Sequence, residues 1–124
     1  QIVVSTGAKQ SIANVCMSLI NKGDEVVIPT PYWVSYSAMV SLADGIPVFV
    51  HPNEGANYKV TAEQLESAIK EKTKMIMLNS PNNPSGSVFS EEEYLEFSKV
   101  LLKYPNKTLK CDENKIFEVV QRRN

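Results

Sequence analysis

The 124-residue sequence lacks the features that mark several large classes of protein. It has no basic excess, because 13 lysine and arginine residues face 14 acidic residues and the formal net charge is −1. Proteins that bind nucleic acid or an anionic membrane surface carry such an excess, so we expect neither partner. No apolar run approaches the roughly 18 residues that a membrane-spanning helix needs, and no basic-then-apolar signal segment opens the sequence.

Residues that bind metal ions are scarce as well. The sequence has one histidine, His51, and two cysteines, Cys16 and Cys111, which lie far apart. They cannot form a zinc site of recognisable spacing, so we predict no metal site. Free cysteine is commonly buried, and we expect both thiols to be buried in a reducing compartment, which favours the cytoplasm.

Short apolar runs alternate with helical patterns along the sequence. The predicted strands are residues 2–5, 25–29, 46–51, 74–80 and 108–112. The predicted helices are residues 9–21, 33–43, 61–71 and a segment that begins at Ser90. The strands are almost wholly apolar, which is typical of strands that helices bury on both faces. The sequence therefore predicts one α/β domain over residues 1–124, a three-layer α/β/α sandwich with a mostly parallel sheet.

The first letters, "QIVVS", predict a strand at the very start, which favours a piece cut from a longer protein. In a parallel sheet, ligands bind beside the loops that follow the carboxyl ends of strands. The segment "STGAKQS", residues 5–11, follows the first predicted strand. Its glycine and the helix start after it offer free backbone N–H groups, which suit a phosphate. An ordinary helix start is the alternative interpretation, since neither a Walker loop nor a G-x-G-x-x-G motif is present.

Two further loops carry residues that suit a planar ligand. The segment "PTPYWVSY", residues 29–36, follows the second predicted strand, and an aromatic ring at the mouth of a sheet can stack on a planar ring. A core aromatic that anchors the next helix is the alternative. The segment "SPNNPSG", residues 80–86, places two asparagine amides between two prolines. These amides can donate and accept hydrogen bonds, although a plain turn also collects such residues.

Asp112 lies at the end of the last predicted strand and adds a carboxylate to the same edge. Its alternative interpretation is a surface acid or a helix cap. Taken together, the four features form a phosphate cradle, a ring to stack on, an amide for a ring substituent and a carboxylate for a basic ring atom. Pyridoxal 5′-phosphate has all four of the matching groups, so the sequence predicts this cofactor.

At these positions the sequence resembles the class I aminotransferases of fold type I, the aspartate aminotransferase group, especially its bacterial branch. The segments that carry the resemblance are "STGAKQSIANV", "GDEVVIPTPYWVSY", "TKMIMLNSPNNPSG" and "CDE". The resemblance runs over residues 1–113 and implies part of the family's large, pyridoxal-phosphate-binding domain. It also implies amino-group transfer between an amino acid and a 2-oxo acid, and a homodimer.

The resemblance implies a role for each matching residue around the cofactor. The backbone amides of Gly7, Ala8 and Lys9 would hold the phosphate. Trp33 would stack on the pyridine ring.

On the other edge of that ring, the resemblance implies that Asn83 donates to the phenolic O3′ and that Asp112 pairs with the pyridine nitrogen. An ionised carboxylate keeps that nitrogen protonated, so the ring can draw in electrons from the substrate.

The tail, residues 114–124, fits the family poorly, because Lys115 stands where the family has a tyrosine. The family's Schiff-base lysine, its carboxylate-binding arginine and its small domain have no counterpart here, so we predict no catalytic residue in this chain and no activity from it alone. The alternative is a non-catalytic α/β interaction domain on the same scaffold.

Overall fold

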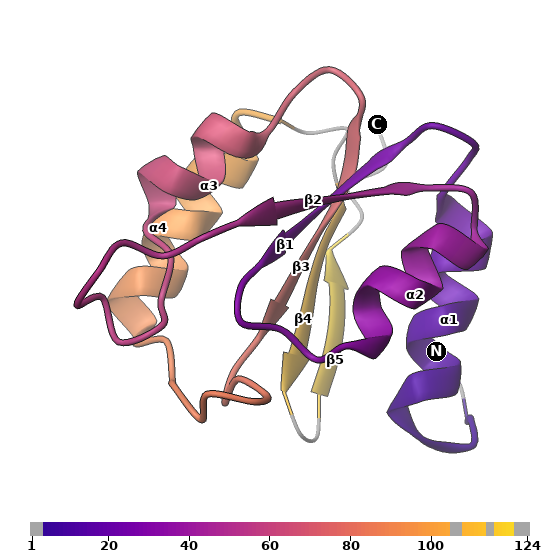
Figure 1. Ribbon diagram of the computed structural model, residues 1–124, viewed down its shortest axis with the longest axis horizontal. Coiled ribbons are helices and arrows are strands. Elements are labelled where there is room, and N and C mark those ends of the chain that lie inside the picture. The colour runs from indigo at the N-terminus through magenta and orange to yellow at the C-terminus, as the bar shows by residue number, and fades with distance from the viewer. Residues whose placement is uncertain (1–3, 105–107, 114–115, 121–124) are drawn as a thin grey trace.

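The computed structural model describes residues 4–104, 108–113 and 116–120, with side chains for residues 4–104. The helices are α1 (Gly7–Leu19), α2 (Ser35–Leu42), α3 (Ala62–Ala68) and α4 (Glu91–Leu102). The strands are β1 (Glu25–Pro29), β2 (Ile46–Val50), β3 (Thr73–Asn79), β4 (Thr108–Glu113) and β5 (Ile116–Val120). The alternation of helices and strands matches the predicted α/β class (Figure 1).

The five strands form one sheet in the order β2-β1-β3-β4-β5. Neighbouring strands are parallel from β2 to β4, and β5 runs antiparallel to β4. The prediction of a mostly parallel sheet is therefore confirmed. The strand β5 was not predicted, because it lies in the tail, residues 114–124, which fits the family poorly.

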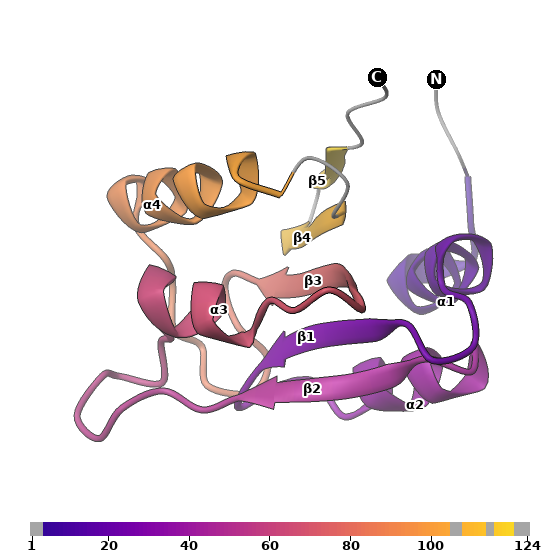
Figure 2. The same cartoon turned by 90° about the horizontal axis from the view of Figure 1, so that it is seen from above.

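The sheet is the middle of three layers, with α1 and α2 on one face and α3 and α4 on the other (Figure 2). Alternate residues of a strand point to opposite faces, and β1 shows this directly. Val26 and Ile28 pack with α1 and α2, whereas Val27 packs with α3 and α4. All three are fully buried. This explains why the strand is apolar throughout rather than alternating.

Helix starts follow the predicted capping residues. The hydroxyl of Thr61 accepts from the Gln64 backbone N–H at 3.2 Å, and the Gln64 side chain accepts from the Thr61 backbone N–H at 2.9 Å. Ser90 and Glu93 form the same reciprocal capping box at the start of α4. The helix ends earlier than predicted at α3, because Ile69 adopts an extended backbone and is buried in the core.

The first predicted strand, residues 2–5, is not seen in the part of it that the structure describes, since Val4 and Ser5 lie outside any strand. Residues 2 and 3 lie outside the described residues.

Cys16 is fully buried, as predicted, whereas the side chain of Cys111 is not among those described. Among the described residues, no helix has the length and apolar character needed to cross a membrane.

Candidate functional site

The segments singled out in the sequence meet at one edge of the sheet. The loop after β1 (residues 30–34), the loop after β3 (residues 80–90) and the carboxyl end of β4 leave the sheet on the same side, the lower edge in Figure 1. This convergence follows from the parallel order of β1, β3 and β4. In α/β sheets such an edge is where ligands bind.

The start of α1 has free backbone donors. Gly7 has a φ of +81°, a left-handed conformation that favours glycine. The Thr6 side chain makes no capping hydrogen bond, whereas α3 and α4 both begin with a full capping box. The backbone N–H groups of Ala8 and Lys9 have no partner among the described residues, whereas the Gly7 N–H, which was also predicted to hold the phosphate, donates to the Ser5 backbone oxygen at 2.9 Å. A helix start in this state can accept an anion such as a phosphate.

Lys9 and Trp33 lie together, although 24 positions separate their numbers in the sequence. The Lys9 Nζ lies 5.0 Å from the centroid of the Trp33 ring, which is a cation–π contact. The Trp33 ring also packs edge-on against Tyr36, with centroids 5.5 Å apart and planes at 85°. Because Tyr36 is buried in the core, this contact fixes the orientation of the half-buried Trp33 ring.

Asn83 is held by the end of β3. Its backbone N–H donates to the Asn79 Oδ1 at 2.7 Å. Its own side chain is exposed and has no hydrogen-bond partner among the described side chains, so the amide is available to a ligand. Asn79 is also the register partner of Asp112 in the parallel pair β3–β4. The backbone therefore places Asp112 beside the residue that holds Asn83, and its side chain lies outside those described.

One side-chain contact joins the two loops. The Asn82 Nδ2 donates to the Pro31 backbone oxygen at 2.8 Å. Sequence reasoning groups Asn82 with Asn83 and gives neither Asn82 nor Asn79 a separate role. The pair of prolines around two amides indicates hydrogen-bonding capacity, but a sequence does not tell which amide points inward.

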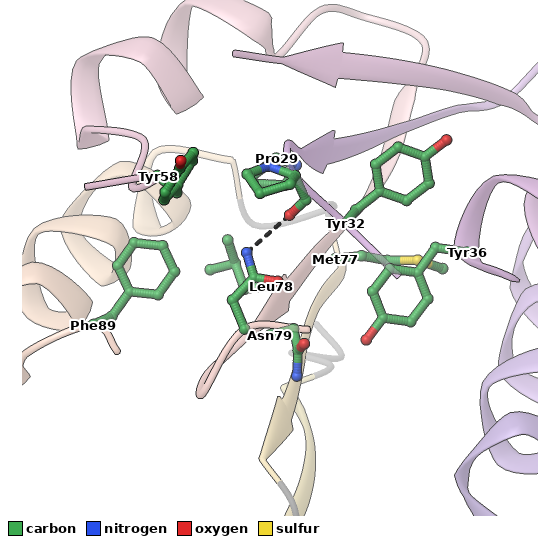
Figure 3. Close-up of a pocket in the computed structure, with 10 residues that line it drawn as sticks. Pro29, Tyr32, Tyr36, Tyr58, Met77, Leu78, Asn79 and Phe89 are labelled. Carbon is green, nitrogen blue, oxygen red and sulfur yellow. Dashed lines mark hydrogen bonds between the residues drawn. The ribbon is translucent and has the colours of Figure 1, made fainter. Parts of the chain in front are cut away.

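A narrow crevice opens between the ends of β1 and β3, as Figure 3 shows. Tyr58 and Phe89 lie on one side of it, and Tyr32, Tyr36 and Met77 lie on the other. Its volume is about 10 Å³, the space of one water molecule. The crevice therefore has no room for a ligand larger than a water molecule.

A second cavity of about 290 Å³ lies between the segment before α3 and the helix α4. Lys59 and Glu93 form an ion pair at its rim, with Nζ and Oε1 2.8 Å apart. Ala62 and Phe97 are among its apolar lining residues. The larger cavity therefore lies between the loop that follows β2 and the helices α3 and α4, and none of the predicted site residues lines it.

Comparison with known proteins decides the family. The family model described as "Aminotransferase class I and II" matches residues 1–114. The chain belongs to this family. A probable aspartate/prephenate aminotransferase of Rickettsia felis is 49% identical over 113 residues, which cover 91% of this chain and 28% of that protein. An aspartate aminotransferase of a Bacillus species is 47% identical over 102 residues, which cover 82% of this chain and 26% of that protein.

Solved structures of aminotransferases share the fold. The aspartate aminotransferase of Rhizobium meliloti aligns with a TM-score of 0.84 at 44% identity, over 87% of this chain and 27% of that one. The Thermus thermophilus enzyme with maleate aligns with a TM-score of 0.85 at 34% identity, over 90% and 29%. The resemblance stated from the sequence is thus confirmed. The chain spans about 28% of the length of the curated relatives that it matches.

Proposed function

We propose that this aminotransferase chain supplies part of a pyridoxal 5′-phosphate site, in a protein that transfers an amino group between an amino acid and a 2-oxo acid. One observation carries the proposal: free helix-start amides, an aromatic ring and a free asparagine amide lie at the start of α1, on the β1 loop and on the β3 loop, and side-chain contacts join these three segments. The names of the relatives favour aspartate as an amino-group donor. A homodimer in the cytoplasm, with no nucleic-acid or membrane partner, belongs to the same proposal.

The residues present fit the cofactor by their chemistry. The backbone N–H groups of Ala8 and Lys9 lack partners among the described residues, which suits a dianionic phosphate, and the left-handed Gly7 shapes the turn before them. The charge of Lys9 favours the same anion. The side chain of Trp33, half-buried and fixed by Tyr36, offers a rigid ring for stacking.

The polar edge of the cofactor would be held by Asn83 and Asp112. The free amide of Asn83 would donate to the phenolic oxygen. Asp112 would keep a proton on the ring nitrogen, because an ionised carboxylate favours the cationic form of a neighbouring base. When bound, the cofactor supplies an electron-withdrawing ring for chemistry at the substrate α-carbon.

No lysine of this chain is proposed as the catalytic lysine. Lys9 lies over the ring of Trp33 and next to the free helix-start amides, which supports a place for it at the phosphate end of the proposed site. Lys115 stands in the tail, outside the described residues. We therefore expect the 124-residue chain to bind the cofactor weakly and to transfer no amino group by itself.

Binding of pyridoxamine 5′-phosphate tests the proposal, because this form lacks the aldehyde and cannot react with surface lysines. Equilibrium dialysis should show saturable binding to the chain. Trp33→Leu should weaken binding about tenfold, the upper range for loss of an aromatic pair. Leu95→Ala, at a position 58% exposed on α4, serves as the control and should leave binding unchanged.

The alternative, a non-catalytic α/β interaction domain, predicts a different result. It predicts no saturable binding of pyridoxamine 5′-phosphate, and equal behaviour of Trp33→Leu and Leu95→Ala. Either of these outcomes would refute the proposed site.

A further inference from the structure

We propose that Asn82 is a positioning residue, which ties the loop that carries Trp33 to the loop that carries Asn83. We call the Asn82–Pro31 hydrogen bond the tie. The effect of the tie on cofactor binding rests on the proposed function, whereas the hydrogen bond itself does not. Nothing in the family match or in the names of the relatives assigns this role to Asn82.

The tie is a single, well-placed hydrogen bond. The Asn82 Nδ2 lies 2.8 Å from the Pro31 backbone oxygen, across 51 positions of sequence. Pro31 lies two residues before Trp33, and Asn82 directly precedes Asn83. A shift of this contact would therefore move both ligand-facing residues relative to each other.

The orientation of the Asn82 amide follows from its partner. A backbone carbonyl can only accept, so the amide nitrogen must be the atom that faces Pro31. The Asn82 Oδ1 is then buried without a hydrogen-bond partner among the described residues. An unpaired buried acceptor is unfavourable, and an apolar side chain of similar size would fill the space without that penalty. The Asn82 amide is therefore better explained by its hydrogen bond to Pro31 than by filling space in the core.

The main chain on both sides of this amide is fixed. The Asn82 backbone N–H donates to the Ser87 oxygen at 2.8 Å, and the Gly86 backbone N–H donates to the Asn82 oxygen at 2.7 Å. The β1 loop is anchored on its other side, because the Thr30 backbone N–H donates to the Val50 oxygen at 2.8 Å. Backbone hydrogen bonds thus hold each of the two loops separately. The Asn82–Pro31 hydrogen bond connects them and sets the position of one loop relative to the other.

The tie matters because the proposed site would contact the cofactor ring on its face and on its edge at the same time. Trp33 would contact the face of the cofactor, and Asn83 would contact its edge. Contacts of this kind depend on placement to within a fraction of an ångström, and a loosened support weakens both without removing either.

The test compares Asn82→Asp with Asn82→Leu, and uses Asn14→Asp as the control. The Asn82→Asp side chain keeps nearly the same shape but turns an acceptor toward the Pro31 oxygen. Leucine removes the donor and the unpaired acceptor together. Asn14 is exposed in α1, so its substitution changes the charge equally without touching the loops. Trp33 is the one tryptophan of the sequence, so its emission reports the β1 loop directly.

We expect a red-shifted Trp33 emission in both Asn82 variants, at a pH where the new carboxyl of Asn82→Asp is ionised. The emission of Asn82→Asp should return toward wild type at low pH, because a protonated carboxyl regains a donor. Both variants should bind pyridoxamine 5′-phosphate about fivefold to tenfold more weakly, the loss expected for one hydrogen bond. Asn14→Asp should match wild type in every measurement.

Wild-type emission in both folded Asn82 variants would overturn the tie. If Asn82→Asp does not fold, as judged by circular dichroism, the emission of Asn82→Leu decides the question alone. A shifted emission in the variants, combined with a wild-type chain that binds no pyridoxamine 5′-phosphate, would support the tie and refute the proposed function, so the two failures are distinguishable.

Discussion

Gly7 and Gly23 form a natural pair for separating backbone strain from ligand binding. Both have left-handed backbones, with φ of +81° and +86°, and a Cβ added at either would meet no atom within 4 Å. Gly7 opens α1 beside the free amides, whereas Gly23 lies in the turn before β1. The cost of alanine at each is therefore conformational, with no steric clash added.

Gly7→Ala and Gly23→Ala should each lower the free energy of unfolding by about 1 kcal/mol, the cost of a left-handed conformation without glycine. Only Gly7→Ala should also weaken the binding of pyridoxamine 5′-phosphate, because only Gly7 shapes the proposed phosphate loop. Urea unfolding and dialysis give the two quantities. Equal binding by the two variants would show that Gly7 has no part in the site.

At the residue scale, the sequence could predict which residue types gather but not their contacts. Trp33 and Asn83 follow β1 and β3, as the sequence predicts, whereas Val4 and Ser5 before Lys9 lie outside any strand. The contact of Lys9 with the Trp33 ring depends on how α1 packs beside the β1 loop, which no local pattern encodes. The roles of Asn79 and Asn82 stayed hidden because each acts through a hydrogen bond that only the folded loops bring together.

In the first turn of helix α4, the pKa of Glu93 links the stability of the folded protein to pH. Burial is the largest single influence on the pKa of Glu93 and raises it, but hydrogen bonds from Lys59 and from the Ser90 backbone N–H outweigh it. The net effect holds the pKa of Glu93 below its ordinary value. A lowered pKa in the folded state contributes stability at pH values above the ordinary glutamate pKa, and the contribution is lost as pH falls through the lowered pKa.

Glu93→Gln should therefore destabilise the protein at about pH 7, and the difference from wild type should shrink as the pH falls below the ordinary glutamate pKa and through the lowered pKa of Glu93. Urea unfolding across this range measures it. Glu91→Gln, at the exposed first position of the same helix, is the control. A difference from wild type that stays constant with pH would contradict the assigned cause.

At the element scale, the sequence indicated where the helices α3 and α4 begin better than where α3 ends. Thr61 and Ser90 marked the first turns of α3 and α4, because a capping box is a local pattern of four residues. The end of α3 at Ala68 depends on Ile69 entering the core, which is a tertiary effect. The antiparallel strand β5, Ile116–Val120, is rich in β-branched and aromatic residues, but its antiparallel direction depends on its pairing with β4.

The whole molecule has an apolar edge at β2. This strand is the outermost of the order β2-β1-β3-β4-β5, and Ile46 and Phe49 are 48% and 40% exposed on it. An edge with unpaired backbone groups and apolar side chains recruits a further strand or chain. Within the described strands, β2 is therefore the expected contact surface for self-association.

Ile46→Lys should reduce self-association of the chain, since a charged residue on an edge strand opposes pairing. Leu95→Lys, 58% exposed on α4, introduces the same charge away from the sheet edge and should leave association unchanged. Sedimentation velocity over a range of concentrations measures both. A wild-type chain that stays monomeric at high concentration would contradict the account of this edge.

The fold class was predictable from the sequence because alternation and apolar strands are properties of the whole chain. The family followed from short segments at the carboxyl edge, and the match over residues 1–114 confirms it. Assembly, by contrast, depends on surfaces such as the β2 edge, whose exposure appears only when the strands are placed in order.

The start of α1, the β1 loop and the β3 loop are proposed to bind one cofactor together. Two-dimensional NMR of the amide resonances during a titration with pyridoxamine 5′-phosphate can show whether they do. We expect the backbone amides of Ala8 and Lys9, the Trp33 indole N–H and the Asn83 side-chain amide to shift along one common binding curve. Shifts confined to one of these segments, or no saturable shift at any of them, would contradict it.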